Sequence, residues 1–441
     1  MSEFQLFAVA GKPVLHSISP QVHNAGFASL GISAAYIRLS AGSGSEAIAT
    51  ARQMGISGLS VTAPFKEEVF GLCKALDPNA RATGAVNTVL IGRRVLSGFN
   101  TDVDGVRLAL EQNGVRISKK RAVVIGAGGA ARAAAFALRK AGASVTIANR
   151  TRHKAEKLAR EFGCASCGLE KKELSAALSD AGILVSTVST HKRLVPASML
   201  RKGMAILDAH YARKTALMSD ANRKGCKVLG PQEWLLCQGL AAFKLFSGRK
   251  APEAAMRKAV DSAFAARSRK LGGSIALVGM MGSGKSTTAG EIARISGMRA
   301  VETDAMVERK QGMSIGEIFR KHGEAYFRRL EREAIAEACS LKRCVISCGG
   351  GAVLDRQNVA MLRRSCVVAW LWATPEESLR RIRGDGTRPL YNVKNRLQLA
   401  RRVMRARLPL YAQASDLTVQ AGGRKPSEIA EGIMDEISHG R

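Results

Sequence analysis

The sequence predicts an α/β protein of several domains built on parallel sheets. Short apolar runs that suit buried strands alternate with amphipathic, Ala- and Arg-rich stretches that suit helices over almost the whole chain. Two glycine-rich loops of different pattern each follow an apolar run and precede a helical stretch. A chain of 441 residues is too long for one hydrophobic core, so we expect about two to four domains.

The clearest candidate strands are apolar runs bounded by turn residues. They cover residues 5–11, 58–63, 121–128, 144–150, 182–188, 204–209, 274–279, 344–350 and 367–372. The clearest break is "SRKLGG", Ser268–Gly273, where charge gives way to paired glycines ahead of a new strand. We therefore expect a linker over residues 266–273 and a further division near Gly105. No internal repeat is evident.

The composition is that of a folded protein, with 46% hydrophobic and 24% charged residues. No run approaches the roughly 18 apolar residues of a membrane span, and "MSEFQLFAVAGKPV" does not have the pattern of a secretion signal. Nine scattered cysteines suit a reducing compartment, so we expect a cytoplasmic protein. Cys164 and Cys167 form the one close pair, and buried thiols are favoured over a metal or redox site because no partner ligands stand nearby.

The net charge of +32 is spread over the whole length. It favours a solvated basic surface that attracts anionic ligands. Nucleic-acid binding is the alternative, but there is no single basic stripe, aromatic interleaving or binding motif to support it.

The second glycine loop, "GMMGSGKST", fits G-x-x-x-x-G-K-[ST] and has the strand before it and the helix after it that this pattern requires. The backbone N–H groups of such a loop surround phosphate oxygens, its lysine reaches the outer phosphates and the next hydroxyl binds Mg²⁺. The sequence predicts a nucleoside triphosphate site at Gly279, Gly282, Gly284, Lys285, Ser286 and Thr287.

The first glycine loop, "VIGAGGAARA", follows the strand-like "RAVVI" and opens a helix, as dinucleotide binding requires. Its expected cofactor contacts are Gly126, Gly128, Gly129 and Ala130. An NAD enzyme generally has an acidic residue after the next strand, to hold the ribose 2′-hydroxyl. This chain has instead Asn149, Arg150, Thr151 and Lys154. They can bind a 2′-phosphate, so we expect NADP(H); the alternative is that they only cap a helix.

Further segments follow the second loop in order: "VETDAMVE", "YFRRLE", "CGGGAV", "RIRGDGTRPL" and "RARLPLY". With them the chain resembles shikimate kinase, a P-loop kinase of the nucleoside-monophosphate-kinase fold, from about Ser274 to the end. The resemblance implies that Arg328 and Arg407 pair with the substrate carboxylate, for which a guanidinium fork is well shaped. It implies that Asp304 holds ring hydroxyls and orients the attacking 3-hydroxyl, and that Gly350 offers its backbone N–H.

The same resemblance places Arg388 on a mobile lid over the transferring phosphoryl group and Arg381 beside the adenine of ATP. Phosphoryl transfer depends mainly on positioning and charge, so this ring of cations matters more than a strong base. Glu302 stands where the family often has the first Asp of Asp-x-Asp. Its longer side chain could hold Mg²⁺ through water, beside Ser286.

Ahead of the first loop lie "VLHSISPQVHN", "GLSVTAPFKEEV", "GAVNTV" and "GFNTDVDG". With these segments residues 1 to 265 resemble shikimate dehydrogenase. The resemblance implies that Lys66 donates a proton to the C3 oxygen while NADPH delivers hydride, and that Asp102 orients Lys66. The implied substrate-binding residues are Ser17, Ser19 and Thr62 for the carboxylate, Asn87 for ring hydroxyls, and Tyr211 and Gln238. Gly230 is kept from a segment that in the family lies on the cofactor side of the site. His16 and His23 are interpreted as structural.

Together the resemblances imply a substrate domain at residues 1–105 with a returning helix at 238–265, a Rossmann NADP domain at 106–237, and a kinase domain at 274–441. The first enzyme would reduce 3-dehydroshikimate to shikimate, and the second would phosphorylate shikimate to shikimate 3-phosphate, two consecutive steps towards aromatic amino acids. Two alternatives stay open. One is a quinate/shikimate dehydrogenase using NAD, and the other is a basic nucleic-acid-binding scaffold with vestigial sites.

Overall fold

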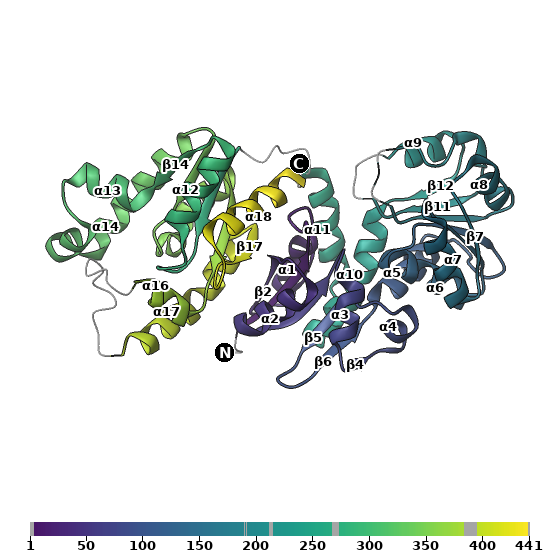
Figure 1. Cartoon of the computed structure of the whole chain (residues 1–441), viewed down its shortest axis with the longest axis horizontal. Helices are drawn as coiled ribbons and strands as arrows, with labels where there is room; N and C mark the ends of the chain where they lie inside the picture. Colours follow the sequence, from purple (N-terminus) through teal and green to yellow (C-terminus); the bar gives the residue numbers. More distant parts are fainter. Residues whose placement is uncertain are drawn as a thin grey trace. The chain divides into compact units, whose positions relative to one another are not determined.

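The computed structural model describes residues 4–188, 190, 192–210, 215–266, 273–382 and 395–439. Helices and strands alternate along them, and every run predicted as a strand coincides with one, which confirms the α/β prediction (Figure 1). The chain divides into two compact units. The first contains residues 1–20, 33–56 and 268–441, and the second contains residues 21–32 and 57–267.

The first unit contains a parallel sheet with the strand order β14-β15-β13-β16-β17-β2-β1. The strands are β1 Gln5–Gly11, β2 Ala34–Ser40, β13 Ser274–Val278, β14 Arg299–Glu302, β15 Cys344–Ser347, β16 Cys366–Trp372 and β17 Leu417–Gln420. Every residue of β16 is buried, as its apolar sequence CVVAWLW suggests for a parallel strand covered on both faces. The sheet formed by β13 to β17 continues into β2, because Thr418 pairs with Leu39 and Val419 with Ser40 (Figure 1).

Helices flank this sheet and carry most of the predicted kinase residues. They are α2 Gly44–Met54, α12 Lys285–Ser296, α13 Thr303–Gln311, α14 Ile315–Ser340, α15 Arg356–Ser365, α16 Pro375–Ile382, α17 Arg396–Ala414 and α18 Pro426–His439. A kink at Gly323, whose φ is 80°, divides α14. The helices α13 and α14 share a small apolar cluster that includes Val307, Ile318 and Phe327. This cluster fixes the two helices that carry Asp304 and Arg328.

The second unit contains a six-stranded parallel sheet of order β12-β11-β10-β7-β8-β9. Its strands are β7 Arg121–Ile125, β8 Ser144–Ala148, β9 Ala165–Cys167, β10 Ile183–Ser186, β11 Ala205–Asp208 and β12 Lys227–Leu229. Numbered within the sheet, the order is 3-2-1-4-5-6, the order of a dinucleotide-binding Rossmann fold. The order reverses beside β7, so this fold binds its ligand where β7 ends.

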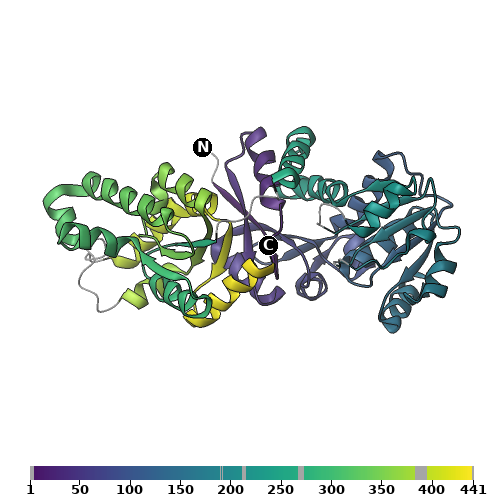
Figure 2. The same cartoon turned by 90° about the horizontal axis from the view of Figure 1, so that it is seen from above.

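Helices cover both faces of that sheet (Figures 1 and 2). One apolar cluster joins it to α5 Thr101–Gln112, α6 Gly129–Lys140 and α7 Arg152–Phe162, and another joins it to α8 Lys171–Leu178 and α9 Ala216–Arg223. The buried face of α6 consists largely of alanines, which favour helix and leave little bulk between helix and sheet.

The rest of the second unit contains β3 Ile56–Val61, antiparallel to β5 Thr88–Ile91, which is antiparallel to β6 Leu96–Phe99; β6 pairs in parallel with β4 Ala75–Leu76. Its helices are α3 Lys66–Leu72, α4 Pro78–Thr83, α10 Pro231–Ser247 and α11 Glu253–Ala266, and α1 spans Ser19–Ser29. The helices α5 and α10 pack closely at Gly105, where a Cβ atom would lie 2.8 Å from atoms of Trp234 and Gln238. No helix in the described part of the chain has the length and apolar character of a membrane span.

Candidate active sites

Lys66 and Asp102 form an ion pair in the second unit. Lys66 is the first residue of α3 and Asp102 lies in the first turn of α5, and Lys66 Nζ lies 2.6 Å from Asp102 Oδ2. The side chains are only 15% and 10% exposed. An ion pair held largely out of water is less screened than a surface pair, so these charges interact strongly.

A buried hydrogen-bond network fixes the start of α5 and therefore Asp102. The side chain of Asn87 accepts a bond from the Thr101 amide at 2.8 Å and donates to Thr101 Oγ1 at 3.0 Å. Asn100 caps the helix, accepting from the Asp102 amide at 3.2 Å, and its own amide group donates to Ala85 O at 3.0 Å. Thr62 is half-buried in the turn before α3, where its carbonyl accepts from the Phe65 amide. The network brings Asn87 beside the first turn of α5.

Ser17 and Ser19 lie in the first unit, Ser17 in the loop after β1 and Ser19 as the first residue of α1. Both are buried, with their hydroxyl oxygens 3.2 Å apart, and Ser17 Oγ also accepts from the Ser19 amide at 3.3 Å. Two hydroxyl donors this close can bind the two oxygens of one carboxylate.

The glycine loop between β7 and α6 ends beside Lys66. A Cβ atom on Gly129 would lie 3.2 to 3.3 Å from side-chain carbons of Lys66, so only glycine permits this approach without a shift. Gly126 has a φ of 121°, which favours glycine, and Gly128 caps α6 without a side-chain hydrogen bond. A Cβ atom on Gly128 would meet nothing within 4 Å of the described residues. The first turn of α6 includes Ala130, and the backbone amides at such a helix N-terminus fit an anionic diphosphate.

The residues expected to select NADP follow β8. Asn149 donates from its side chain to Thr151 O at 3.0 Å, and Thr151 caps α7 without a side-chain bond. Arg150 and Lys154 are exposed. Arg152 is exposed too, but it is paired with Glu156 and Glu173. The segment therefore presents two exposed cations and a hydroxyl that makes no capping bond, and these groups suit a phosphate.

Gly230 and Gln238 belong to α10, Gly230 as its N-cap. The Gln238 amide group donates to Leu235 O within the same helix at 3.0 Å. Tyr211 lies outside the described residues.

The phosphate loop joins β13 to α12 in the first unit. Gly279, Gly282 and Gly284 have φ values of 147°, 80° and 89°, so the turn depends on glycine. Lys285 Nζ donates to Gly279 O and Met280 O, both at 3.0 Å. The Ser283 hydroxyl is buried and makes no hydrogen bond within the described residues. The loop and its lysine therefore fit the phosphates of a nucleoside triphosphate.

Ser286 follows the lysine and its hydroxyl donates to Glu302 Oε1. It also lies 3.3 Å from the hydroxyl of Ser347, at the end of β15. A carboxylate and two hydroxyls meet here, and such oxygen ligands suit Mg²⁺ and its water shell. Ser286 and its neighbour Thr287 are both exposed.

Two acidic residues meet behind the glycines that follow β15. A Cβ atom on Gly349 would lie 2.7 Å from Asp304 Oδ1 and 2.8 Å from Glu331 Oε1. Glu331 Oε1 is buried and has no hydrogen-bond partner within the described residues, whereas Glu331 Oε2 accepts from Arg328 Nη1 at 2.8 Å. Burial raises the pKa of the Glu331 carboxyl, against the opposing effect of Arg328. A hydroxyl donor would satisfy this oxygen.

Two arginines lie against the same glycines. A Cβ atom on Gly351 would overlap Arg328 Nη1, and Arg407 Nη1 donates to Gly350 O at 3.0 Å. The Tyr411 hydroxyl donates to the same carbonyl at 2.7 Å. The glycine segment thus places Asp304, Glu331, Arg328 and Arg407 around one backbone turn. This set suits a ligand that has both hydroxyls and a carboxylate.

Arg381, on α16, crosses to the phosphate loop, where its Nη1 donates to Ser283 O at 3.2 Å and its Nη2 donates to Ala421 O at 2.7 Å. Arg388 lies outside the described residues.

Comparison with known proteins decides the family. Residues 9–89 match the model of the shikimate dehydrogenase substrate binding domain, residues 107–217 that of shikimate/quinate 5-dehydrogenase, and residues 235–260 that of the shikimate 5′-dehydrogenase C-terminal domain. A shikimate dehydrogenase (NADP(+)) from Halobacterium salinarum is 40% identical over 263 residues, covering 58% of this chain and 98% of that protein. The chain belongs to the shikimate dehydrogenase family.

Residues 281–438 match the model of shikimate kinase. This shikimate dehydrogenase therefore also has a shikimate kinase domain, and the chain is a bifunctional enzyme of the shikimate pathway, with an oxidoreductase and a kinase. Both resemblances drawn from the sequence are confirmed.

Solved structures agree over the dehydrogenase part. The shikimate 5-dehydrogenase of Thermus thermophilus with NADP(H) and shikimate has 35% identity and a TM-score of 0.54, covering 59% of this chain and 100% of that one. Quinate dehydrogenase from Corynebacterium glutamicum with NAD has 26% identity and the same TM-score and coverage.

The residues of these sites that were missed from the sequence include Asn100, Thr101 and Glu331. Each lies inside a segment that was singled out, "GFNTDVDG" or "YFRRLE". The Asn-Thr pair directly ahead of an acidic residue has the pattern of a helix cap and could have indicated the first two. Glu331 lies three residues after Arg328, on the same face of one helix.

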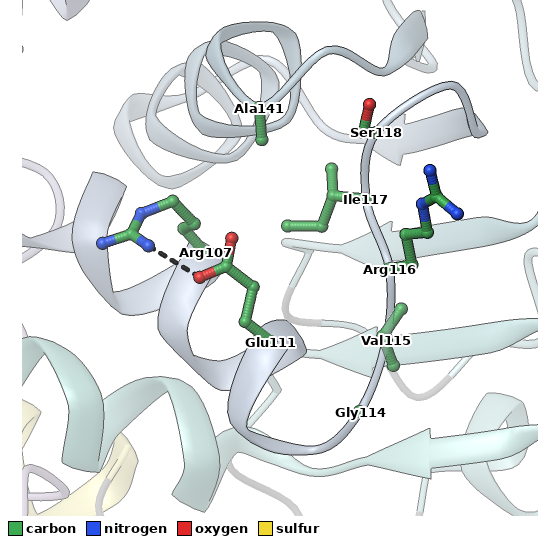
Figure 3. A pocket seen from close by; sticks show the side chains of 8 residues that line it. All are labelled: Arg107, Glu111, Gly114, Val115, Arg116, Ile117, Ser118 and Ala141. Atoms are coloured by element: carbon green, nitrogen blue, oxygen red, sulfur yellow. Dashed lines mark hydrogen bonds and ion pairs between the residues drawn. The ribbon is translucent and has the colours of Figure 1, made fainter.

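A surface hollow of about 500 Å³ in the dehydrogenase is separate from these sites (Figure 3). Arg107 and Glu111 line it from late in α5, as does Ala141 just after α6. At about 1.5 Å per residue, Asp102 lies about 7 Å along α5 from Arg107 and about 14 Å from Glu111, and Gly129 lies about 18 Å along α6 from Ala141. The hollow therefore does not include the Lys66–Asp102 pair.

The cysteines and His23 indicate no further catalytic or metal site in the part of the chain that the structure describes. All nine cysteines are free, and burial raises the thiol pKa of Cys164 and Cys167. Within the described ranges no cluster of three His, Cys, Asp or Glu side chains could hold a metal ion. His23 packs among Phe27, Phe243 and Phe246, and burial lowers its pKa to about 3, so it is a neutral core residue.

Proposed function

We propose that the dehydrogenase reduces 3-dehydroshikimate to shikimate with NADPH and that the kinase phosphorylates the 3-hydroxyl of shikimate with ATP and Mg²⁺. The single observation that carries the first half is the shielded Lys66–Asp102 pair beside the glycine loop. The second half is carried by two acids and two arginines gathered around the glycines that follow β15.

In the reduction, NADPH supplies the hydride when bound. The Lys66 ammonium donates a proton to the C3 oxygen and stabilises negative charge as it develops there. Asp102 holds Lys66 in place through the 2.6 Å contact and accepts a hydrogen bond from the neighbouring hydroxyl. Ser17, Ser19 and Thr62 bind the carboxylate, and Asn87 binds a ring hydroxyl. Tyr211 and Gln238 complete the substrate set.

The cofactor is held by backbone and by cations. The amides at Gly126, Gly128, Gly129 and Ala130 bind the diphosphate, and Gly230 lies on the nicotinamide side. The 2′-phosphate is bound by Asn149, Arg150, Thr151 and Lys154. The exposed positions of Arg150 and Lys154 support this choice of NADP, as does the name of the Halobacterium salinarum relative.

In the phosphorylation, ATP supplies the phosphoryl group when bound, and Mg²⁺ neutralises phosphate charge. The triphosphate is held by Gly279, Gly282, Gly284, Lys285, Ser286 and Thr287. Ser286 and Glu302 would hold the metal and its water, and the contact between their side chains supports this role. Asp304 orients the 3-hydroxyl, Arg328 and Arg407 bind the carboxylate, and Gly350 contributes its amide. The resemblance gives Arg381 a role beside the adenine and Arg388, outside the described residues, a role in neutralising charge on the transferring phosphoryl group.

We propose domain boundaries at residues 1–105 with 238–265, at 106–237 and at 274–441, with the linker at 266–273. The boundary at Gly105 divides α5 rather than a loop. Nine free cysteines support a reducing compartment, the cytoplasm.

One assay tests both activities. The purified chain receives 3-dehydroshikimate, NADPH, ATP and Mg²⁺, and the product is identified by mass; shikimate 3-phosphate is expected. Initial rates with quinate and NAD⁺ against shikimate and NADP⁺ separate the proposal from the quinate alternative, and a preference for the former pair would refute it. Salt-dependent binding to duplex DNA without turnover would favour the scaffold alternative.

A further inference from the structure

The loop of residues 14–19 connects β1 to α1 and presents Ser17 and Ser19. Its residues Val14 and Leu15 are buried, at 0% and 8% exposure. A turn is closed where the Ser17 amide donates to Val14 O at 3.0 Å. The amides of Val14 and Leu15 point out of this turn, so each needs an acceptor from elsewhere because a buried, unbonded amide is costly.

Glu436, on the last helix of the kinase domain, supplies that acceptor. Its Oε2 accepts from the Val14 amide at 2.7 Å and from the Leu15 amide at 2.9 Å. Its Oε1 accepts from the hydroxyl of Ser40, on β2, at 2.8 Å. Glu436 is 1% exposed. One buried carboxylate thus fixes the start of the loop from the opposite end of the sequence.

The far end of the loop is also tied to the kinase domain. Arg38, on β2, donates from Nε to Ser17 O at 2.7 Å and from Nη1 to Asp416 O at 3.0 Å. Asp416 stands directly before β17, and the pairing of β17 with β2 holds this region in register. The serine loop is therefore tied to the kinase domain at its start through Glu436, and at Ser17 through Arg38 and Asp416.

We propose that Glu436 is a positioning residue for the dehydrogenase: by fixing the amides of Val14 and Leu15, it aligns the hydroxyls of Ser17 and Ser19 for the carboxylate of shikimate. The inference rests on the proposed function of those serines. Hydroxyls that must grip one carboxylate together lose affinity when their backbone shifts by about 1 Å. The kinase domain is in this way part of the substrate site of the other enzyme.

A neighbouring contact provides a matched control. Arg424 Nη2 lies 2.5 Å from both carboxylate oxygens of Glu46, on α2, and these side chains are 28% and 25% exposed. This pair joins the same two parts of the chain but is not bonded to the serine loop. Arg424→Ala therefore reports on general loosening of the contact, whereas Glu436→Ala reports on the loop.

The test uses the full chain and follows shikimate oxidation with NADP⁺. In Glu436→Ala we expect KM for shikimate to rise roughly tenfold, with KM for NADP⁺ and the kinase KM for shikimate within about twofold. Glu436→Gln should restore most of the loss, because its amide oxygen can accept from Val14 and Leu15 and its NH₂ can donate to Ser40. Arg424→Ala should leave KM unchanged. An equal rise in Arg424→Ala, or none in Glu436→Ala, overturns the proposal.

Hydrogen–deuterium exchange of the peptide that contains residues 14–19 gives a readout that does not depend on turnover. Exchange should speed up in Glu436→Ala and not in Arg424→Ala; unchanged exchange in Glu436→Ala overturns the proposal. If the wild-type chain fails to oxidise shikimate, the proposed function fails, while exchange still decides whether Glu436 positions the loop.

Discussion

The ammonium nitrogen of Lys66 lies 2.6 Å from a carboxylate oxygen of Asp102, and the two side chains come from the first turns of different helices. Gly129 lies against the aliphatic part of the same lysine. The dehydrogenase thus joins a shielded charge pair to the start of its cofactor loop. That arrangement puts a proton donor next to where a dinucleotide would bind.

Replacing Lys66 should stop reduction and spare phosphorylation. In Lys66→Met the aliphatic chain remains but the proton donor is lost, so we expect kcat for 3-dehydroshikimate to fall about 10³-fold. The kinase kcat should stay within about twofold. Steady-state assays of both reactions measure this, with the exposed Lys74→Met as control. A kinase that failed in parallel would mean that the sites are not independent.

Replacing Lys285 should have the opposite effect. Its ammonium group lies in the phosphate loop, 3.0 Å from two carbonyl oxygens, and would be drawn to phosphate oxygens. In Lys285→Met we expect the kinase kcat to fall at least about 10²-fold, with shikimate oxidation unaffected. A coupled ADP-release assay checks the first expectation and NADPH absorbance the second. Retention of kinase activity would contradict the assignment.

Arg328→Lys should weaken substrate binding at the kinase. Arg328 is 21% exposed and pairs with Glu331 and Glu324, and lysine cannot reproduce the planar fork that bonds both acids and that would also bind a ligand carboxylate. We expect the kinase KM for shikimate to rise roughly tenfold or more, with KM for ATP unchanged. The neighbouring Arg329→Lys is the matched control, since Arg329 is exposed and lies over Tyr326. Similar changes in both variants would argue against a carboxylate contact.

His23 makes the stability of the chain sensitive to acid. Its pKa in the folded chain is about 3, against 6.5 ordinarily, because burial disfavours the cation. The unfolded chain therefore takes up a proton as pH falls through 6.5, while the folded chain does so only near 3. The stability that neutral His23 allows is complete above pH 6.5 and declines below it, by about 2 kcal/mol at pH 5.

Urea unfolding at pH 7 and pH 5 measures that loss. In His23→Gln the difference between the two pH values should shrink by about 2 kcal/mol. The exposed His153→Gln should behave as wild type. Equal losses in all three proteins would show that His23 does not carry the effect.

Most of the strands and loops that were predicted from the sequence were recognised by local patterns. Strands such as β13 and β16 are buried on both faces and read as apolar runs, and the phosphate loop is fixed by glycines within one short segment. The strands β2 and β17 were not predicted. Arg38 interrupts the first after four apolar residues, and the second is only four residues long, so neither has a long apolar run to mark it.

Contacts between distant segments could not be predicted from the sequence, for a physical reason. Nothing in "EGIMDEISH" marks Glu436 as the acceptor for amides near residue 14, because that role depends on how α18 packs after folding. Glu331 and Asn100 are intermediate cases, since their segments were recognised but the geometry that makes them useful was not visible. Tertiary packing, rather than propensity, decides such residues.

The pairing of β17 with β2 means that the dehydrogenase and the kinase share a β-sheet as well as one polypeptide chain. A break in the chain near residue 270 would remove the covalent link but not the pairing of β17 with β2 or the bonds of Glu436 to Val14 and Leu15. Expressing the reductase without its companion would instead uncover a bare strand edge, which invites self-association. Separating the two enzymes into two genes would therefore require changes to the residues of this exposed strand edge as well as a new stop codon.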